Sequence, residues 1–317
     1  GGLSEVRFRT DPMEPAASHQ LGRATLEIGG GSASFGLRRL TDLPRPGGCR
    51  AARLEVATIA SRVFSNTRSV RVLLPPSYDD PGQAGTRFPV IYFTDGIAAM
   101  DSGGWGVPAV ADSLWCQGKL PEAIVVAIDN GGSTREATRP VLDRAEEFLP
   151  FPDQTWTAPP LPVARGAGFP AFLFDEVMPL IASRYRVRSE ATDVTLAGSS
   201  YGAAIMLYAA LIRPGRVGAL LLESPSLHIG DDSLLAMAAA ADQLPARVYL
   251  GVGTAEGDDR EAQEGMVERV ERLAVMLRRR EPAVAIRVEK VVGGIHWFSA
   301  WRERLPVALQ FTLPKVE

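Results

Sequence analysis

The chain has 317 residues, of which 46% are hydrophobic and 22% charged, a composition typical of a globular protein with a substantial core. A net charge of -3 and a pI near 5.8 argue against nucleic-acid binding, because phosphate recognition needs clustered, excess Lys and Arg. No stretch approaches the roughly 20 apolar residues that span a bilayer. We therefore expect a small-molecule partner, with no nucleic acid and no membrane span.

The first part of the chain differs from the rest. Short strand-like runs at 24–40 and 48–61 are separated by Gly-rich and Pro-rich turns, so we predict a small N-terminal β extension over 1–58 and a main domain over 59–317. Cys49 and Cys116 lack the spacing of a metal site, and we interpret them as free thiols, with one disulfide as the alternative. The chain begins Gly-Gly and shows no basic-then-apolar leader, so a targeting peptide was either removed or never existed. These patterns do not determine the location, and a cytoplasmic one is slightly favoured.

Beyond residue 70, short apolar runs alternate with helical patterns. The runs are hydrophobic on both faces, as in strands covered by helices on either side, and they lie at 70–75, 88–96, 123–130, 193–198, 217–225, 247–253 and 285–294. Helical spacing of apolar residues is clearest at 170–185 and 261–280. The alternation predicts an α/β fold with a mostly parallel central sheet and helices on both faces.

Ligands of such sheets bind beyond the carboxyl ends of the strands, so chemistry is expected just after each run. The segment 131–168 is rich in Pro and short of long apolar runs. We interpret it as an excursion over the strand ends that forms a lid or a binding wall.

The stretch Gly198-Ser199-Ser200-Tyr201-Gly202 fits the pattern G-x-S-x-G between a strand-like run and a helical one. In this pattern the central serine occupies a strained strand-to-helix turn, and the residues two before and two after it must be small. Ser200 is therefore the candidate nucleophile, and Ser199 is interpreted as a small packing residue.

A serine hydroxyl needs a base to take its proton, and the chain has only three histidines. His19 lies in the N-terminal region, and His228 follows the strand after the nucleophile, where a polar or substrate contact is the alternative. In α/β-hydrolases the order along the chain is Ser, acid, His. His296, after the last expected strand, is the only histidine that leaves room for an acid on a later strand.

The acid is expected after the strand at 247–253, where Glu256, Asp258 and Asp259 compete. Glu256 is preferred because it is nearest the strand end, while the alternative role of these carboxylates is to cap the next helix. The amide of Tyr201 and that of Ile97, which follows the turn Asp95-Gly96, are the expected oxyanion donors. No metal and no cofactor are expected.

With these segments assembled, the chain resembles the esterase D and enterochelin-esterase-like α/β-hydrolases, a family related to the antigen 85 mycolyltransferases and feruloyl esterases. The landmarks are "VRVLLPPSYDD", "FPVIYFTDG", "AIVVAIDNGGSTRE", "FLFDEVMPLIASRYRV", "LAGSSYGA", "GVGTAEGDD" and "GGIHWFSAWRERLP", in family order over residues 60–310. The sequence departs from the family where Ile295 separates the glycines from His296.

The resemblance implies serine esterase chemistry with Ser200 as nucleophile, His296 as base and Glu256 as acid, and with Ile97 and Tyr201 at the oxyanion hole. It also implies a substrate contact for Arg135, to which we add Gly96 and Trp297; Trp301 is interpreted as structural. The expected substrate is a siderophore-like or other secondary-metabolite ester or lactone, from the aromatic and Arg content expected around the pocket: Trp105, Trp156, Arg135, Arg139 and Trp297. The alternatives are an acyltransferase with the same triad and a catalytically silent binding protein. The oligomeric state is not determined by these patterns.

Overall fold

The computed structural model describes residues 49–134, 136–157, 159–280 and 283–313, together with the backbone of three strands nearer the N-terminus. These three strands form an antiparallel sheet in the order β1-β2-β3, and their bounds are β1 (Arg7–Thr10), β2 (Gln20–Ile28) and β3 (Gly31–Arg38).

The chain divides into two compact units, Gly1–Ala51 and Ala52–Glu317. The predicted boundary between residues 58 and 59 falls inside strand β4 (Arg53–Ser61), which pairs with the next strand along its whole length. Residues 53–58 thus contribute to the sheet of the larger unit. The prediction of free thiols was wrong, because Cys49 and Cys116 are each disulfide-bonded.

The larger unit is built on an eight-stranded sheet in the order β11-β10-β9-β8-β6-β7-β5-β4. All neighbours from β11 to β7 are parallel, whereas β5 is antiparallel to both β7 and β4. The remaining strands are β5 (Asn66–Leu74), β6 (Val90–Phe93), β7 (Ile124–Ile128), β8 (Val194–Ser199), β9 (Ala219–Glu223), β10 (Arg247–Ala255) and β11 (Ala285–Ile295). This is the mostly parallel sheet predicted from the sequence.

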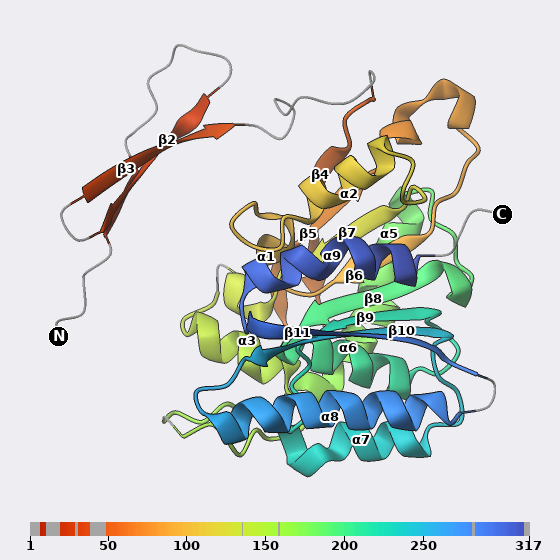
Figure 1. The fold of residues 1–317 in the computed structure, drawn as a ribbon. Coiled ribbons are helices and arrows are strands. Elements are labelled where there is room, and N and C mark those ends of the chain that lie inside the picture. Colours follow the sequence, from red (N-terminus) through yellow and green to blue (C-terminus); the bar gives the residue numbers. More distant parts are fainter. Residues whose placement is uncertain are drawn as a thin grey trace. The chain divides into compact units, whose positions relative to one another are not determined.

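Helices cover both faces of this sheet (Figure 1). On one face lie α1 (Gly96–Met100), α2 (Val107–Cys116) and α9 (Phe298–Thr312). On the other lie α3 (Pro140–Phe148), α4 (Phe169–Ala171), α5 (Met178–Arg184), α6 (Tyr201–Ile212), α7 (Ile229–Ala240) and α8 (Arg260–Arg278). A π-helical turn, Phe172–Val177, joins α4 to α5, so the predicted helical segment at 170–185 is present.

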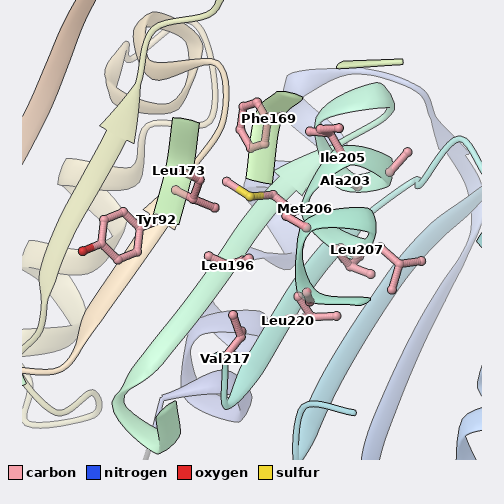
Figure 2. Packing of buried hydrophobic residues seen from close by; sticks show 14 of the residues in the cluster. Tyr92, Phe169, Leu173, Leu196, Ala203, Ile205, Met206, Leu207, Val217 and Leu220 are labelled. Atoms are coloured by element: carbon pink, nitrogen blue, oxygen red, sulfur yellow. The ribbon is translucent and has the colours of Figure 1, made fainter. Parts of the chain in front are cut away.

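Alternate residues of the inner strands enter opposite cores, which explains why sequences such as those of β6 and β7 are apolar throughout. Along β6, Val90 and Tyr92 belong to the core beneath α6, while Ile91 and Phe93 belong to the core beneath α9. Figure 2 shows the first of these cores, where Tyr92 and Leu196 of the sheet lie near Met206 of α6. Burial on both faces holds the strands rigidly and fixes where their carboxyl ends point.

Within the described part of the chain, no helix combines the length and apolar character needed to cross a membrane.

Candidate active site

Ser200 occupies a sharp turn between β8 and α6. Its backbone has φ 56° and ψ -128°, a conformation that L-residues rarely adopt, and its amide donates to the carbonyl of Glu223 over 3.0 Å. The flanking glycines are required by contact. A Cβ on Gly198 would meet the carbonyl of Gly202, and a Cβ on Gly202 would meet the hydroxyl of Thr94. The small residues of G-x-S-x-G are therefore needed for the turn to close.

The hydroxyl of Ser200 lies 3.5 Å from that of Ser226, just beyond the end of β9. The backbone reinforces this contact, since the amide of Ser226 donates to the carbonyl of Ser200 over 3.3 Å. Among the hydrogen bonds of the described residues, none joins Ser200 to His296. In this state the candidate nucleophile is paired with a second serine.

Glu256 and His296 come together beyond the ends of β10 and β11. Oε2 of Glu256 lies 3.1 Å from Nδ1 of His296, and the Glu256 side chain is fully buried. One of the competing carboxylates has the alternative role: Asp259 caps α8 by accepting from the amide of Ala262 over 2.8 Å. Of the three acids proposed from sequence, Glu256 is the one within hydrogen-bond distance of His296.

The other oxygen of Glu256 is held by two donors. Oε1 accepts from the Ser224 hydroxyl over 2.7 Å and from the Gly253 amide over 2.5 Å. Ser224 is itself oriented by the indole N–H of Trp301, which donates to its hydroxyl over 2.8 Å. Two donors on one oxygen fix the carboxylate plane and leave the other oxygen directed at the imidazole.

The loop that carries His296 accommodates the additional Ile295 by an irregularity in the sheet. The pairing steps from Gly253 with Val291 to Ala255 with Ile295, so β11 contains extra residues there. The ring of His296 then packs edge-on against Trp301, with 5.2 Å between ring centroids. Trp301 is 4% exposed, which fits the structural role expected for it.

The amides of Tyr201 and Ile97 each lie in the first turn of a helix. In α6 the first helical hydrogen bonds are made by Ala203 and Ala204, so the amide of Tyr201, the first residue, has no intrahelical acceptor. Ile97 is the second residue of α1, where the first helical bond is made by Ala99, so its amide has none either. Such amides concentrate positive potential at the helix N-terminus. Both can therefore serve as donors to an oxyanion.

Asp95 sets the turn before Ile97 in a left-handed conformation, with φ 55°. Arg144 of α3 donates to both Asp95 oxygens, over 2.6 and 2.7 Å, and the Asn130 amide donates to one of them over 2.6 Å. Burial alone would lower the pKa of Arg144, but Asp95 raises it, so the guanidinium stays charged. A bidentate ion pair therefore braces the turn that carries a candidate oxyanion donor.

The predicted substrate contacts have different environments. Arg135 lies outside the described residues, and Gly96 is buried against Asp129, where a Cβ would not fit. Trp297 is 59% exposed and packs only partly on Phe298. Of the predicted contacts that the structure describes, Trp297 is the one whose side chain is open to a ligand.

Two of the residues behind the substrate prediction are engaged in the scaffold. Trp105 is 2% exposed and packs between Phe93 and Trp301 in the core, so it does not line a pocket. Arg139 forms ion pairs with Asp143 and with Glu146. Trp105 is therefore not part of a pocket, and Arg139 is held by two carboxylates.

Asp153, on the excursion, was not predicted as part of the site. Its side chain is 1% exposed and accepts from the Tyr201 hydroxyl, from His228 Nε2 over 3.4 Å, and from the amide and hydroxyl of Thr155. Burial by itself would raise the pKa of Asp153, but the hydrogen bonds from His228, Tyr201 and Thr155 hold it well below its usual range. This carboxylate ties 131–168 to the residue after the candidate nucleophile. No local pattern marks it.

The strand order, the strained serine turn and the His–carboxylate pair beyond the last two strands define an α/β-hydrolase. The model of the family described as "Esterase: Putative esterase" matches residues 61–312, and the chain belongs to this esterase family. It is therefore a carboxylic ester hydrolase by family. No curated protein sequence matches the chain.

Solved structures share the fold. The enterobactin esterase FES from Shigella flexneri, with 2,3-di-hydroxy-N-benzoyl-serine, is 22% identical with a TM-score of 0.63, over 92% of this chain and 66% of that one. An IroE-like serine hydrolase from Shewanella oneidensis is 16% identical with a TM-score of 0.61, over 81% and 78% of the two chains. A ferulic acid esterase from Anaeromyces mucronatus is 18% identical with a TM-score of 0.59, over 84% and 92%. At these identities the likeness concerns the fold.

Proposed function

We propose that the protein hydrolyses carboxylic esters through an acyl-enzyme formed on Ser200. His296 takes the serine proton during attack, and Glu256 orients the imidazole and stabilises it when charged. The amides of Ile97 and Tyr201 donate to the oxyanion. Water deprotonated by His296 then releases the acid and regenerates the serine.

The observation that carries this proposal is the contact of 3.1 Å between Glu256 and His296, at the same sheet edge as Ser200. Burying a carboxylate costs free energy unless its charge is paired and hydrogen-bonded. Here Oε2 of the buried Glu256 side chain faces the imidazole of His296. The strained backbone of Ser200, with φ 56°, is a second feature common at reacting residues.

Proton transfer requires the Ser200 hydroxyl to exchange Ser226 for His296. The Ser200 to Ser226 contact of 3.5 Å is long and therefore weak, so giving it up costs little. Catalytic hydrogen bonds commonly tighten only when substrate is bound. We expect the serine hydroxyl to turn toward the imidazole in that complex.

The proposed substrate is a siderophore-like or other secondary-metabolite ester or lactone. Support comes from the exposed indole of Trp297, which follows His296 directly and offers an apolar face to a substrate ring. Structures of the same fold include an enterobactin esterase, determined with 2,3-di-hydroxy-N-benzoyl-serine, and ferulic acid esterases, and the ligands named for them carry aromatic groups.

A fluorophosphonate probe tests the nucleophile directly. We expect covalent labelling of the wild type and of Ser199→Ala, a matched control one residue away, and no labelling of Ser200→Ala. Turnover of a short p-nitrophenyl ester by Ser200→Ala should fall by about 10⁴-fold or more, because triad members act as a unit. Persistent labelling of Ser200→Ala would show that another serine reacts.

Product analysis tests the substrate class and the fate of the acyl group. We expect a catecholate trilactone to be cut faster than an aliphatic ester of similar size, with free acid as the product. Transfer to an added alcohol in preference to water would instead identify an acyltransferase. Absence of turnover on every ester by the folded protein would favour a binding role.

A further inference from the structure

A buried arginine lies behind the Glu256–His296 pair. Arg304 of α9 donates to Oε2 of Glu223 from Nε over 2.8 Å and from Nη2 over 2.6 Å. The same Nη2 lies 3.8 Å from Oε1 of Glu256. The side chains of Arg304, Glu223 and Glu256 are 4%, 0% and 0% exposed. One cation is thus shared by two carboxylates that water does not reach.

The sequence makes space for this group. Glu223 is the last residue of β9, and its carboxylate lies over Gly251 of β10, where any Cβ would overlap it. Its backbone carbonyl also accepts from the Ser200 amide. The backbone of Glu223 therefore contacts the candidate nucleophile, and its side chain contacts the arginine that lies beside Glu256.

Stability alone does not account for the arrangement. A buried ion pair contributes little net stability relative to apolar residues of the same volume. Here the pair is also incompletely satisfied: among the described residues, Nη1 of Arg304 has no hydrogen-bond partner. Unsatisfied buried polar groups call for a reason other than packing.

We propose that Arg304 and Glu223 are positioning residues that set how much negative charge Glu256 presents to His296. When both carboxylates are ionised, the three buried side chains carry one net negative charge, which matches the imidazolium formed during catalysis. The positive charge of Arg304 partly offsets the negative charge of Glu256, and Glu223 weakens this effect because it binds the same guanidinium. This inference rests on the proposed function of Glu256 and His296.

The titratable groups around the cluster support a role in acid–base balance. Glu223 faces Arg304, Glu256 and the phenol of Tyr249, and Tyr249 in turn faces Glu289 and Arg287 of β11. Burial raises the pKa of Glu223 to about 7, against the lowering influence of Arg304. Glu223 therefore carries its charge above about pH 7 and loses it below, within the range where an imidazole titrates.

The test is the midpoint of the acid limb in a profile of kcat/KM against pH, measured with a p-nitrophenyl ester. In Arg304→Met the carboxylates lose their shared cation, the imidazolium of His296 is better stabilised, and the midpoint should rise by about one pH unit. In Glu223→Gln the charge of Arg304 is balanced by Glu256 alone, so the imidazolium of His296 is less well stabilised. The midpoint should fall by about half a pH unit. Opposite signs from two changes in one ion pair cannot arise from general destabilisation.

Asp232→Asn is the matched control, since it removes a carboxylate from an ion pair with Arg269 and Arg272 on α8 and should leave the midpoint unchanged. Fluorophosphonate labelling counts the competent sites in each variant. If Arg304→Met does not fold, the same substitution is made together with Glu223→Gln, so that neutral groups replace both members of the ion pair. The midpoint of the acid limb should then be higher than in Glu223→Gln alone.

The two proposals fail in different ways. A wild type that neither reacts with the probe nor turns over ester would overturn the proposed function and this inference with it. Suppose instead that the wild type is active, and that the midpoint of the acid limb shifts by less than about 0.2 pH units in Glu223→Gln and in Arg304→Met, made alone or together with Glu223→Gln. That result would overturn the role of Arg304 and Glu223 alone.

Discussion

Two arginine–carboxylate pairs stand behind the candidate site, one on each side, and they differ in burial. Arg304 and Glu223 are 4% and 0% exposed, and both come from the α/β scaffold. Arg144 and Asp95 are 28% and 10% exposed, and Arg144 is supplied by α3 of the excursion 131–168. The scaffold pair lies behind the acid–base residues, whereas the excursion pair lies behind the oxyanion turn.

The difference in burial implies a difference in what each pair does. Charge acts over distance where water is absent, so the scaffold pair can tune a neighbouring imidazole. A partly exposed pair is screened, and its main contribution is geometric, through the two parallel hydrogen bonds to Asp95. The variants below separate geometric effects from electrostatic ones.

Among the variants that test this comparison, the largest effect is expected for Arg144→Met. Without the bidentate bonds, nothing from Arg144 holds Asp95 in its left-handed backbone conformation. The Ile97 amide is then no longer held in the direction of the oxyanion. We expect kcat to fall roughly 100-fold, the cost of one oxyanion donor, with a smaller change in KM. Steady-state kinetics with active-site counting measures this.

Arg144→Lys is the companion variant, because it keeps the charge and loses the planar fork. If geometry matters most, its kcat should remain close to that of Arg144→Met. Recovery to the wild-type value by lysine would mean that charge suffices, and the two arginine pairs would then act alike.

Ser224→Ala addresses the scaffold side, with a smaller effect. It removes the hydroxyl donor from Glu256 Oε1 and leaves the Gly253 amide in place. The loss of one hydrogen bond to a charged group predicts a roughly tenfold lower kcat. Because no charge is changed, the acid limb of the pH profile should stay where it is, unlike in Arg304→Met.

Position 224 has φ 46°, so backbone strain must be separated from hydrogen bonding. Ser224→Gly provides the control, since glycine adopts this conformation without penalty. We expect Ser224→Gly to be more stable than Ser224→Ala in thermal unfolding and equally slow. A kcat for both variants equal to that of the wild type would show that the Gly253 amide alone orients Glu256.

Asp153→Asn tests the attachment of the excursion, mainly through stability. The buried carboxylate accepts from Tyr201, His228 and Thr155, and replacing it leaves donors unpaired, which predicts a loss of about 1–3 kcal/mol at pH 7. The folded-state pKa of Asp153 is below its unfolded value of 3.8, so its contribution is present above that pH and is lost as the pH falls further.

The difference in Tm between wild type and Asp153→Asn should therefore shrink below about pH 4. Asp175→Asn, at an exposed ion pair with Arg213, is the control and should change stability by less than about 0.5 kcal/mol. A constant difference in Tm across pH would mean that Asp153 contributes by packing and not by charge.

The fold could be predicted because its signals are local. Apolar residues at consecutive positions of 90–93 and 194–199 indicate strands buried on both faces, and the helical spacing at 261–280 indicates the helix α8. Candidate residues next to strand ends could be selected for the same reason. Ser200 and Glu256 directly follow such runs, and the structure brings Glu256 to His296.

The supporting residues could not be predicted, because nothing in the local sequence marks them. Arg304 meets Glu223 across 81 positions, and Arg144 meets Asp95 across 49. Asp153 lies in the stretch 149–157, which forms no helix or strand, and its role follows only from the side chains that donate hydrogen bonds to it. Cys49 and Cys116 were misread for a related reason: two distant cysteines carry no local evidence of being bonded.

The smallest effect is expected for Trp297→Ala. This indole is 59% exposed and makes no described hydrogen bond, so its removal should leave Tm within a degree or two, as is usual for exposed side chains. If it covers a substrate ring, KM for an aromatic ester should rise about three- to tenfold, while KM for an acetyl ester stays unchanged. Trp297→Phe keeps the aromatic face and should restore most of the affinity. An equal rise in KM for both esters would show that Trp297 shapes the loop of His296 and does not contact the acyl group.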